Sequence, residues 1–209
     1  WVYRMTLEDA VSRATRSVND CPDGNNDCRN AWNVLQLVNV PGSAVIHGAE
    51  LSAAVESELG LDARATLTWA VGDEPDPSGS TERTPISRVP PMNGTFELHW
   101  AHDNGLWLGG ASRWALDQDR LSAGDIADER IPRGGTPGYA VFDLRAGYRM
   151  DQFFAGSITL ENLGDAAYRA HGSSVNGPGR SILLHLEFGF TTQQPEAHES
   201  DIHLLESPS

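Results

Sequence analysis

The residues with reactive or metal-binding side chains are scattered along this chain and form no recognisable motif. His99 and His102 are close in sequence but fall on opposite faces of any strand that continues through both, so they do not make an obvious metal pair. No glycine-rich loop follows a strand and opens a helix, and Ser173-Ser174 lacks the context of a nucleophile elbow. We therefore predict no catalytic site, no cofactor and no enzymatic activity. The seven histidines are His47, His99, His102, His171, His185, His198 and His203.

Five carboxylates crowd one stretch of the chain, Asp117, Asp119, Asp125, Asp128 and Glu129. Hard cations such as calcium take oxygen ligands, so a calcium site is conceivable there. The spacing, however, matches no EF-hand loop. We interpret the stretch as a solvated acidic loop and predict no metal site.

The two cysteines, Cys21 and Cys28, lie in the turn-rich segment CPDGNNDC. Two cysteines that close a short polar loop favour a disulfide formed in an oxidising compartment. A zinc site would need two further ligands, and His47 is the nearest histidine in sequence. The disulfide is our prediction, with free thiols or metal binding as the alternatives.

The composition excludes several classes of protein. The 209 residues have a formal net charge of -14, and all 15 basic residues are arginine. Such acidity argues against a general nucleic-acid binder, which needs a basic face for phosphates. No apolar run approaches the roughly 18 residues of a membrane helix, although membrane barrels use strands that are only half apolar.

Apolar and polar residues alternate with a period of two in the last third of the chain, between Thr136 and Phe190. This period predicts long strands with one apolar and one polar face. The same alternation runs from Ala63 to Val71 and from Thr95 to Trp100. The apolar sets of the last third are Ala140, Phe142, Leu144, Ala146 and Tyr148, and then Ile182, Leu184, Leu186, Phe188 and Phe190.

The first 60 residues are harder to interpret. We expect a strand at the start, because Trp1, Tyr3 and Met5 alternate, while a helical turn up to Val18 remains an alternative. A strand at the first residue also suggests that the sequence starts inside a domain. A polar loop follows to residue 31, and 32–59 reads as one long strand, or two strands joined at Pro41-Gly42.

Together these patterns predict eight strands whose connections are alternately long and short, with the long ones all at one end. Outer-membrane barrels have this arrangement, with tight periplasmic turns and long outer loops. Aromatic residues lie near strand ends, as expected at a membrane interface. These are Trp69, Trp100, Trp107, Trp114, Tyr139, Tyr148, Phe154 and Phe190. Charged residues on the other face are expected to form a salt network in the barrel wall, namely Arg64, Arg113, Asp143, Arg145, Glu161 and Glu187.

Several motifs in order carry a family resemblance. They are Asn39-Val40 with Ile46-His47-Gly48-Ala49-Glu50, Ile86-Ser87-Arg88-Val89-Pro90-Pro91, Gly138 to Tyr148, Leu160-Glu161-Asn162-Leu163-Gly164-Asp165 with Tyr168-Arg169, and Gly177-Pro178-Gly179-Arg180. Over residues 33–190 the chain resembles the C-terminal β-barrel portion of a TonB-dependent outer-membrane receptor. The resemblance implies an all-β fold, an antiparallel up-and-down meander of about eight long strands from a large transmembrane barrel. The plug and earlier strands of such a barrel are absent from this sequence. We expect 1–190 to be barrel and 191–209 to be an acidic, disordered tail.

The resemblance also implies a function in the outer membrane of a Gram-negative bacterium. Such receptors take up a scarce nutrient, such as a ferric siderophore, haem or cobalamin, with energy from the TonB complex acting on the plug. The partners would be outer-membrane lipid and a nutrient bound at the outer loops, with no nucleic acid. The expected outer loops are 12–32, 73–93, 117–136 and 164–178. The alternatives are a self-contained small barrel that acts as an anchor or adhesin, and a soluble β-sandwich binding module.

Overall fold

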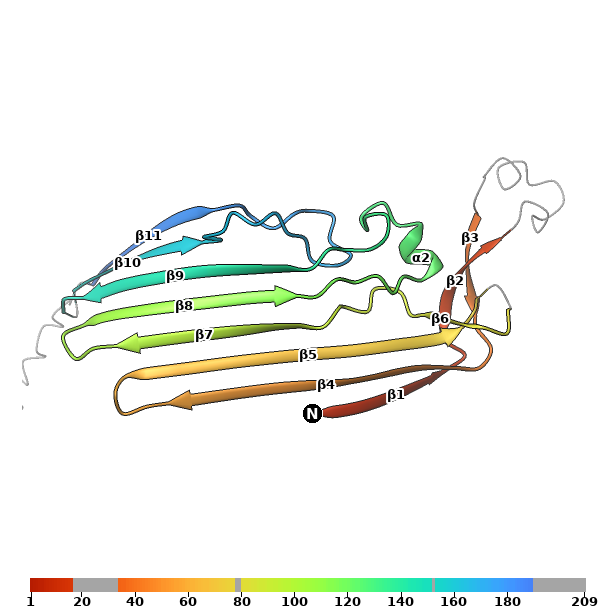
Figure 1. The fold of residues 1–209 in the computed structure, drawn as a ribbon, viewed down its shortest axis with the longest axis horizontal. Coiled ribbons are helices and arrows are strands. Elements are labelled where there is room, and N and C mark those ends of the chain that lie inside the picture. The colour runs from red at the N-terminus through yellow and green to blue at the C-terminus, as the bar shows by residue number, and fades with distance from the viewer. Residues whose placement is uncertain (17–33, 78–79, 152, 190–209) are drawn as a thin grey trace, which may run out of the picture.

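The alternating segments form one large antiparallel sheet in the computed structural model, which describes residues 1–16, 34–77, 80–151 and 153–189 (Figure 1). Each strand pairs with the next one along the sheet, as the eight-stranded meander requires. The strands, in sheet order, are β1 (Val2–Glu8), β4 (Ser43–Glu56), β5 (Leu61–Pro75), β7 (Asn93–Ala101), β8 (Leu106–Ala115), β9 (Tyr139–Arg149), β10 (Phe154–Glu161) and β11 (Ser181–Phe188). The predicted all-β fold class is therefore confirmed.

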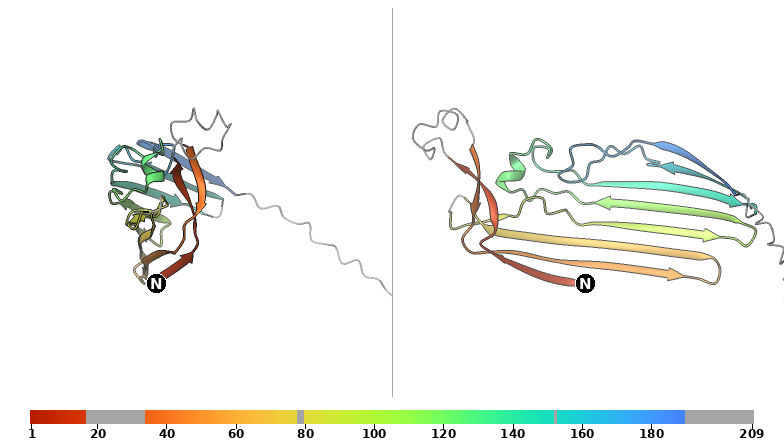
Figure 2. Two further views of the ribbon diagram at one scale, coloured as in Figure 1. Left: turned by 90° about the vertical axis from the view of Figure 1, so that its right-hand side faces the viewer. Right: turned by 180° about the vertical axis from the view of Figure 1, so that it is seen from behind.

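The sheet is open. Strands β1 and β11 lie at its two ends and do not pair with each other in the described part of the chain. Seen from the long-loop end, the sheet is a curved layer (Figure 2). Eight strands that closed on themselves would pair their first and last members. The alternative of a self-contained small barrel is therefore wrong for this arrangement, which is that of a segment of a wider wall.

Short turns and long connections separate to opposite ends of the sheet, as predicted (Figure 1). The short turns at 57–60, 102–105 and 150–153 join β4 to β5, β7 to β8 and β9 to β10. Gly60 and Gly105 adopt positive φ angles of 73° and 90° in two of these turns. A Cβ at either position would collide with a backbone carbonyl, of Ala101 and Arg149 respectively, so both turns require glycine.

Three elements at the long-loop end were not predicted, the strands at 11–16 and 83–85 and the helix at 123–126, whereas the strand at 34–39 falls within the predicted 32–59. Strands β2 (Val11–Arg16) and β3 (Val34–Asn39) pair as a separate hairpin that stands off the main sheet (Figure 1). A three-residue strand β6 (Arg83–Pro85) pairs with β5, and the short helix α2 (Ala123–Ile126) follows β8. The helical alternative for residues 11–16 is wrong. The predicted break at Pro41-Gly42 is confirmed, and Gly42 has a φ of 105°.

The strand register places apolar residues of neighbouring strands in continuous rows. Ala65 pairs with Phe96, Phe96 with Ser112, and Ser112 with Phe142, so all four lie on one face of the sheet. We call this the apolar face. It includes Leu51, Leu67, Leu98, Leu108, Leu144, Ile158, Leu184 and Leu186.

Aromatic residues border the apolar face at its long-loop end and at its short-turn end. Trp69 and Trp114 lie toward the long loops, whereas Trp100, Tyr148 and Phe154 lie toward the short turns. Strand β5 covers roughly 26 Å between residues 61 and 69, at about 3.3 Å per residue. This length matches the apolar band of roughly 25 Å on outer-membrane barrels. On the described strands no Asp, Glu or Arg lies on this face between the two borders.

Two aromatic residues predicted at the membrane interface lie on the opposite, polar face instead. Trp107 pairs with Gly147 and covers its backbone, and Tyr139 stacks on Tyr168 with ring centroids 4.9 Å apart. Position near a strand end therefore does not decide which face a ring occupies. The polar face includes Arg64, Glu97, Arg113, Asp143, Arg145, Glu161 and Glu187.

Little of the described apolar surface is buried within the chain. Phe142 is 53% exposed and Leu98 41%, although both lie on inner strands of the sheet, and Leu184 on the edge strand β11 is 70% exposed. The buried apolar residues are instead few and lie mostly near the long loops, such as Val40 and Ile131. A soluble sandwich would cover its apolar face with a second sheet. The alternative of a soluble sandwich is therefore wrong for the described strands. No helix in these ranges is long and apolar enough to cross a membrane.

The apolar face predicts a strongly face-dependent cost of charge. Leu144→Arg places a charge in the middle of this face and should destabilise the bilayer-inserted protein by about 2–4 kcal/mol. Ala111→Arg is the matched control, because Ala111 lies on the polar face and pairs with Glu97 and Asp143. Urea unfolding in phospholipid vesicles measures both. An equal cost for the two variants would contradict the assignment of the faces.

Candidate functional site

Asp125 joins two of the long loops, 76–92 and 116–138. Its carboxylate accepts hydrogen bonds from Ser87 Oγ at 2.7 Å, from the Arg88 backbone N–H at 3.2 Å and from the Ser122 backbone N–H at 3.1 Å. The Ser122 hydroxyl accepts in return from the Asp125 N–H and caps α2. The side chain is 1% exposed. The expectation of a solvated acidic loop is therefore wrong at this residue, because folding of the 76–92 loop buries it.

The neighbouring carboxylates are also bound by protein donors. Asp128 pairs with Arg88 at 2.7 Å and with Arg130 at 2.6 Å, and Asp117 accepts from the Gly138 N–H at 2.7 Å. Among the described residues, no group of three His, Cys, Asp or Glu side chains is placed to hold a metal ion. The carboxylates of this stretch thus hold the long loops together. The predicted disulfide residues Cys21 and Cys28 lie outside the described residues.

Asn162 ties together the two ends of the loop at 162–180. It is fully buried, and its backbone N–H donates to Asp143 Oδ1 at 2.8 Å. Its side-chain amide donates to the carbonyls of Ala166 and Pro178 at 2.9 and 3.0 Å. Its φ of 47° is a left-handed conformation that asparagine tolerates better than most residues. These contacts explain why asparagine suits the position directly after β10.

An aromatic and cationic cluster lies beneath that loop on the polar face. Tyr168 stacks on Tyr139, covers Gly177 and has the guanidinium carbon of Arg113 at 5.8 Å from its ring centroid. Arg113 also pairs with the buried Asp143 at 3.4 Å. This pair joins two residues of the salt network that was expected in the wall. A second pair joins Arg149 to Glu187 at 2.8 Å.

His171 sits where three of the long loops meet. Its Nδ1 is 2.9 Å from Thr136 Oγ1, and its buried Nε2 has no hydrogen-bond partner within the described residues. Burial lowers the pKa of the imidazole below its ordinary value. The Asp125 carboxylate opposes this shift, Arg88 reinforces it, and Asp128 opposes it. The sequence offered no signal for this residue beyond its type, because only the fold brings the loops together.

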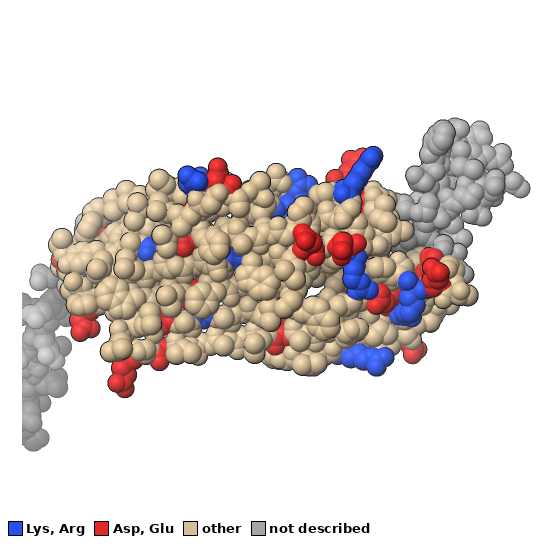
Figure 3. All heavy atoms as spheres, viewed as in Figure 1, with Lys and Arg blue, Asp and Glu red and all other residues tan. Residues whose placement is uncertain are grey.

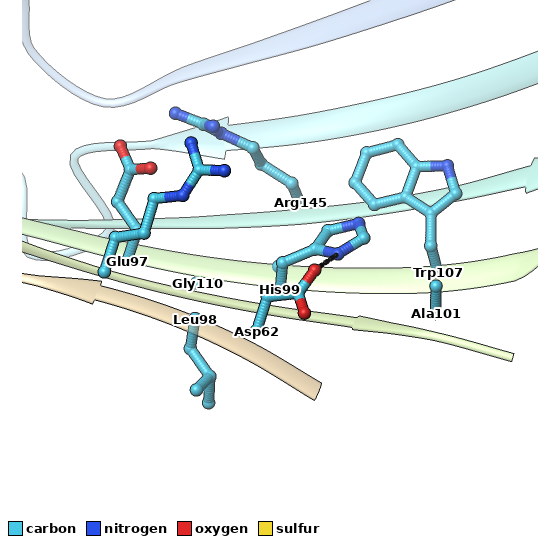
Figure 4. A pocket seen from close by; sticks show the side chains of 10 residues that line it. Asp62, Glu97, Leu98, His99, Ala101, Trp107, Gly110 and Arg145 are labelled. Carbon is cyan, nitrogen blue, oxygen red and sulfur yellow. Dashed lines mark ion pairs between the residues drawn. The ribbon is translucent and has the colours of Figure 1, made fainter. Parts of the chain in front are cut away.

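A hollow of about 490 Å³ lies on the polar face, toward the short turns (Figure 4). Glu97, Arg145 and Trp107 line it, and His99 Nδ1 is 3.8 Å from Asp62 Oδ2. His99 and Asp62 are nearly half exposed, so solvent screens this contact. His102 follows the end of β7 and lies against Trp100, with ring centroids 5.7 Å apart. The hollow is therefore lined by both acidic and basic side chains that are accessible to water.

A second hollow, of about 370 Å³, lies under the β2–β3 hairpin. Val11 and Ser12 of the hairpin face Arg88 and Asp128 of the loops across it, and Ser12 Oγ donates to the buried Glu74 carboxylate at 2.8 Å. On the face seen in Figure 3, charged side chains gather over this long-loop end, whereas the strand region of that face is mostly uncharged. The long-loop end is therefore the candidate ligand-facing site.

An open curved sheet with an apolar outer face, a polar inner face and fastened loops at one end is a wall segment of a transmembrane β-barrel. A sequence model described as TonB dependent receptor-like, beta-barrel matches residues 2–164, which is most of the chain. The chain belongs to this family. Its members are transport receptors of the Gram-negative outer membrane and not enzymes. No curated protein sequence matches the chain.

Solved receptor structures share the fold. The copper transporter OprC is 22% identical with a TM-score of 0.66, and the chain covers 28% of it. The ferric-catecholate import receptor Fiu from E. coli K12 is 19% identical with a TM-score of 0.60 and 24% covered. The ferric enterobactin receptor PfeA from Pseudomonas aeruginosa is 21% identical with a TM-score of 0.61 and 28% covered. Each match includes 90% of this chain. The chain thus spans about a quarter of the length of these receptors.

Two glycines of the 162–180 loop provide a matched test of its packing. A Cβ on Gly177 would overlap the Tyr168 ring, whereas a Cβ on Gly164 would meet nothing within 4 Å. Gly177→Ala should therefore destabilise the complete protein by about 1–3 kcal/mol through overpacking. Gly164→Ala should change stability by less than about 0.5 kcal/mol. Denaturant unfolding in detergent compares the two, and equal stability of both variants would refute the packing of Tyr168.

Proposed function

We propose that this chain is the C-terminal part of the barrel of an outer-membrane receptor that imports a scarce nutrient by energy-coupled transport in a Gram-negative bacterium. The observation that carries the proposal is the family match on an open eight-stranded wall with all its long loops at one end. Only a larger barrel would cover the free edges of β1 and β11. The aromatic borders would then lie at the two membrane interfaces.

The ligand belongs to the class of scarce metal complexes or cofactors, such as a ferric siderophore, haem or cobalamin. Solved structures of the same fold include a copper transporter and receptors for ferric catecholates and ferric enterobactin, which supports a metal-containing ligand. The long-loop end faces outward in this proposal. Asp125 and Asn162 would hold the loops so that side chains at the barrel mouth keep a fixed arrangement for binding.

Import would need partners that this chain does not contain. A plug inside the barrel would receive energy from the TonB complex, and movement of the plug would admit the ligand. The polar face is suited to such a lumen, because its charges are paired or hydrated and its apolar counterpart faces away. The role of these residues is therefore to form a hydrated wall and a binding mouth, with no chemical step.

Uptake by cells tests the proposal. A strain that lacks the complete reading frame should lose uptake of one nutrient class among ferric catecholate, haem, cobalamin and copper, each offered at limiting concentration. Reintroduction of the intact gene should restore uptake, and collapse of the proton gradient should abolish it.

Asp125→Ala separates loop fastening from barrel assembly in the same assay. We expect weaker ligand binding with an unchanged amount of protein in the membrane, because the substitution removes the acceptor for three donors. The proposal would be wrong if the deletion strain took up all four nutrients normally under conditions in which the parent strain makes the protein.

A further inference from the structure

The loops at 76–92, 116–138 and 162–180 meet at one imidazole. His171 of the 162–180 loop contacts Thr136 of the 116–138 loop, with 2.9 Å between Nδ1 and Oγ1. The next residue, Gly172, lies against the side chain of Arg88 from the 76–92 loop. Arg88 is itself paired with Asp128 at 2.7 Å. Release of His171 would therefore remove one tie between the 162–180 loop and the 116–138 loop and would loosen the contact with Arg88.

The imidazole is held in an incompletely satisfied state. If Thr136 donates to Nδ1, then Nε2 carries a proton without an acceptor. If Nδ1 donates to Thr136, then Nε2 is a buried acceptor without a donor. Either tautomer leaves one polar group without a partner within the described residues, a cost that most buried groups avoid.

Within the described residues, the groups around the His171 ring offer no free acceptor that would stabilise a second proton on the imidazole. From the 116–138 loop, both oxygens of Asp125 already accept hydrogen bonds, from Ser87, Arg88 and Ser122. Asp128 accepts from Arg88 and Arg130. The remaining charged neighbours are cations: Arg88, and Arg169 of the same loop, which donates to the Arg130 carbonyl at 3.2 Å. A protonated His171 would thus add positive charge at a buried junction whose carboxylates are engaged.

We propose that His171 is a proton-sensitive clasp, which holds the three loops together over the barrel mouth when neutral and releases the 162–180 loop when protonated. Each opening takes up one proton. Burial lowers the pKa of His171 in the closed arrangement, whereas a hydrated imidazole in the open arrangement titrates near its ordinary value of about 6.5. The closed arrangement is therefore favoured above that pH and loses its advantage as the pH falls. This inference does not depend on the identity of the imported nutrient.

A spin label on the 162–180 loop tests the clasp directly. Ser174→Cys provides an exposed attachment point, in the complete protein with Cys21 and Cys28 replaced by serine and purified in detergent. We expect the mobile fraction of the nitroxide spectrum to rise several-fold between pH 8 and pH 5. His171→Gln, which cannot take up a proton, should abolish the pH dependence. His102→Gln, at the short-turn end, should leave it unchanged.

Two further variants retain His171. They test whether its protonation controls release of the loop, even if His171→Gln loosens the loop at every pH. Arg88→Gln removes a cation that lowers the pKa of His171 in the closed arrangement, so this pKa moves closer to that of the open arrangement. Protonation then favours release less, and the midpoint of release should move to lower pH. Asp128→Asn removes a carboxylate that raises this pKa, so the gap between the pKa values of the closed and open arrangements widens and the midpoint should move to higher pH. Opposite shifts support the clasp. A mobile fraction that does not respond to pH, or a midpoint that ignores both variants, would overturn it.

Discussion

The alternation of side chains across a hydrogen-bonded sheet is the constraint on which the rest of this structure depends. Register links the strands, so the face of one residue determines the face of every residue paired with it. Ala65, Phe96, Ser112 and Phe142 share a side for this reason. The register of a single row therefore determines, for every strand of the wall, which residues face lipid and which face the lumen. The same constraint places Arg113 and Asp143 together, because both are one residue away from that row.

The long-loop end follows a different physical rule from the wall. The strands are held by backbone pairing and need little burial, whereas the loops are held by a few buried polar side chains. Asp125 and Asn162 are almost inaccessible to solvent, and each satisfies several donors or acceptors. A buried polar hub specifies one arrangement, because any other would leave its partners unsatisfied. The barrel mouth thus acquires a defined shape without an apolar core.

Much of the wall could be predicted from the sequence, and little of the mouth. Period-two alternation and turn residues locate the eight strands, since both signals are local. Trp107 and Tyr139 were expected at the membrane interface but lie on the polar face, because nearness to a strand end does not reveal parity. Strand β2 and the four-residue α2 carry too short a periodic signal. The roles of Asp125 and His171 depend on contacts between loops that are distant in sequence, which no local pattern contains.

Two hydrogen bonds at the base of the 162–180 loop make the conformation of its tip independent of the strands of the wall. Asn162 bonds to Pro178, and Asp165 accepts from the Arg180 N–H at 2.9 Å, so the two ends are joined before the chain reaches the exposed tip. Insertions or replacements at the tip, around Val175 and Asn176, need not disturb the pairing of β10 with β11. One barrel frame can in this way carry many different tips, and recognition can diverge while the wall stays the same.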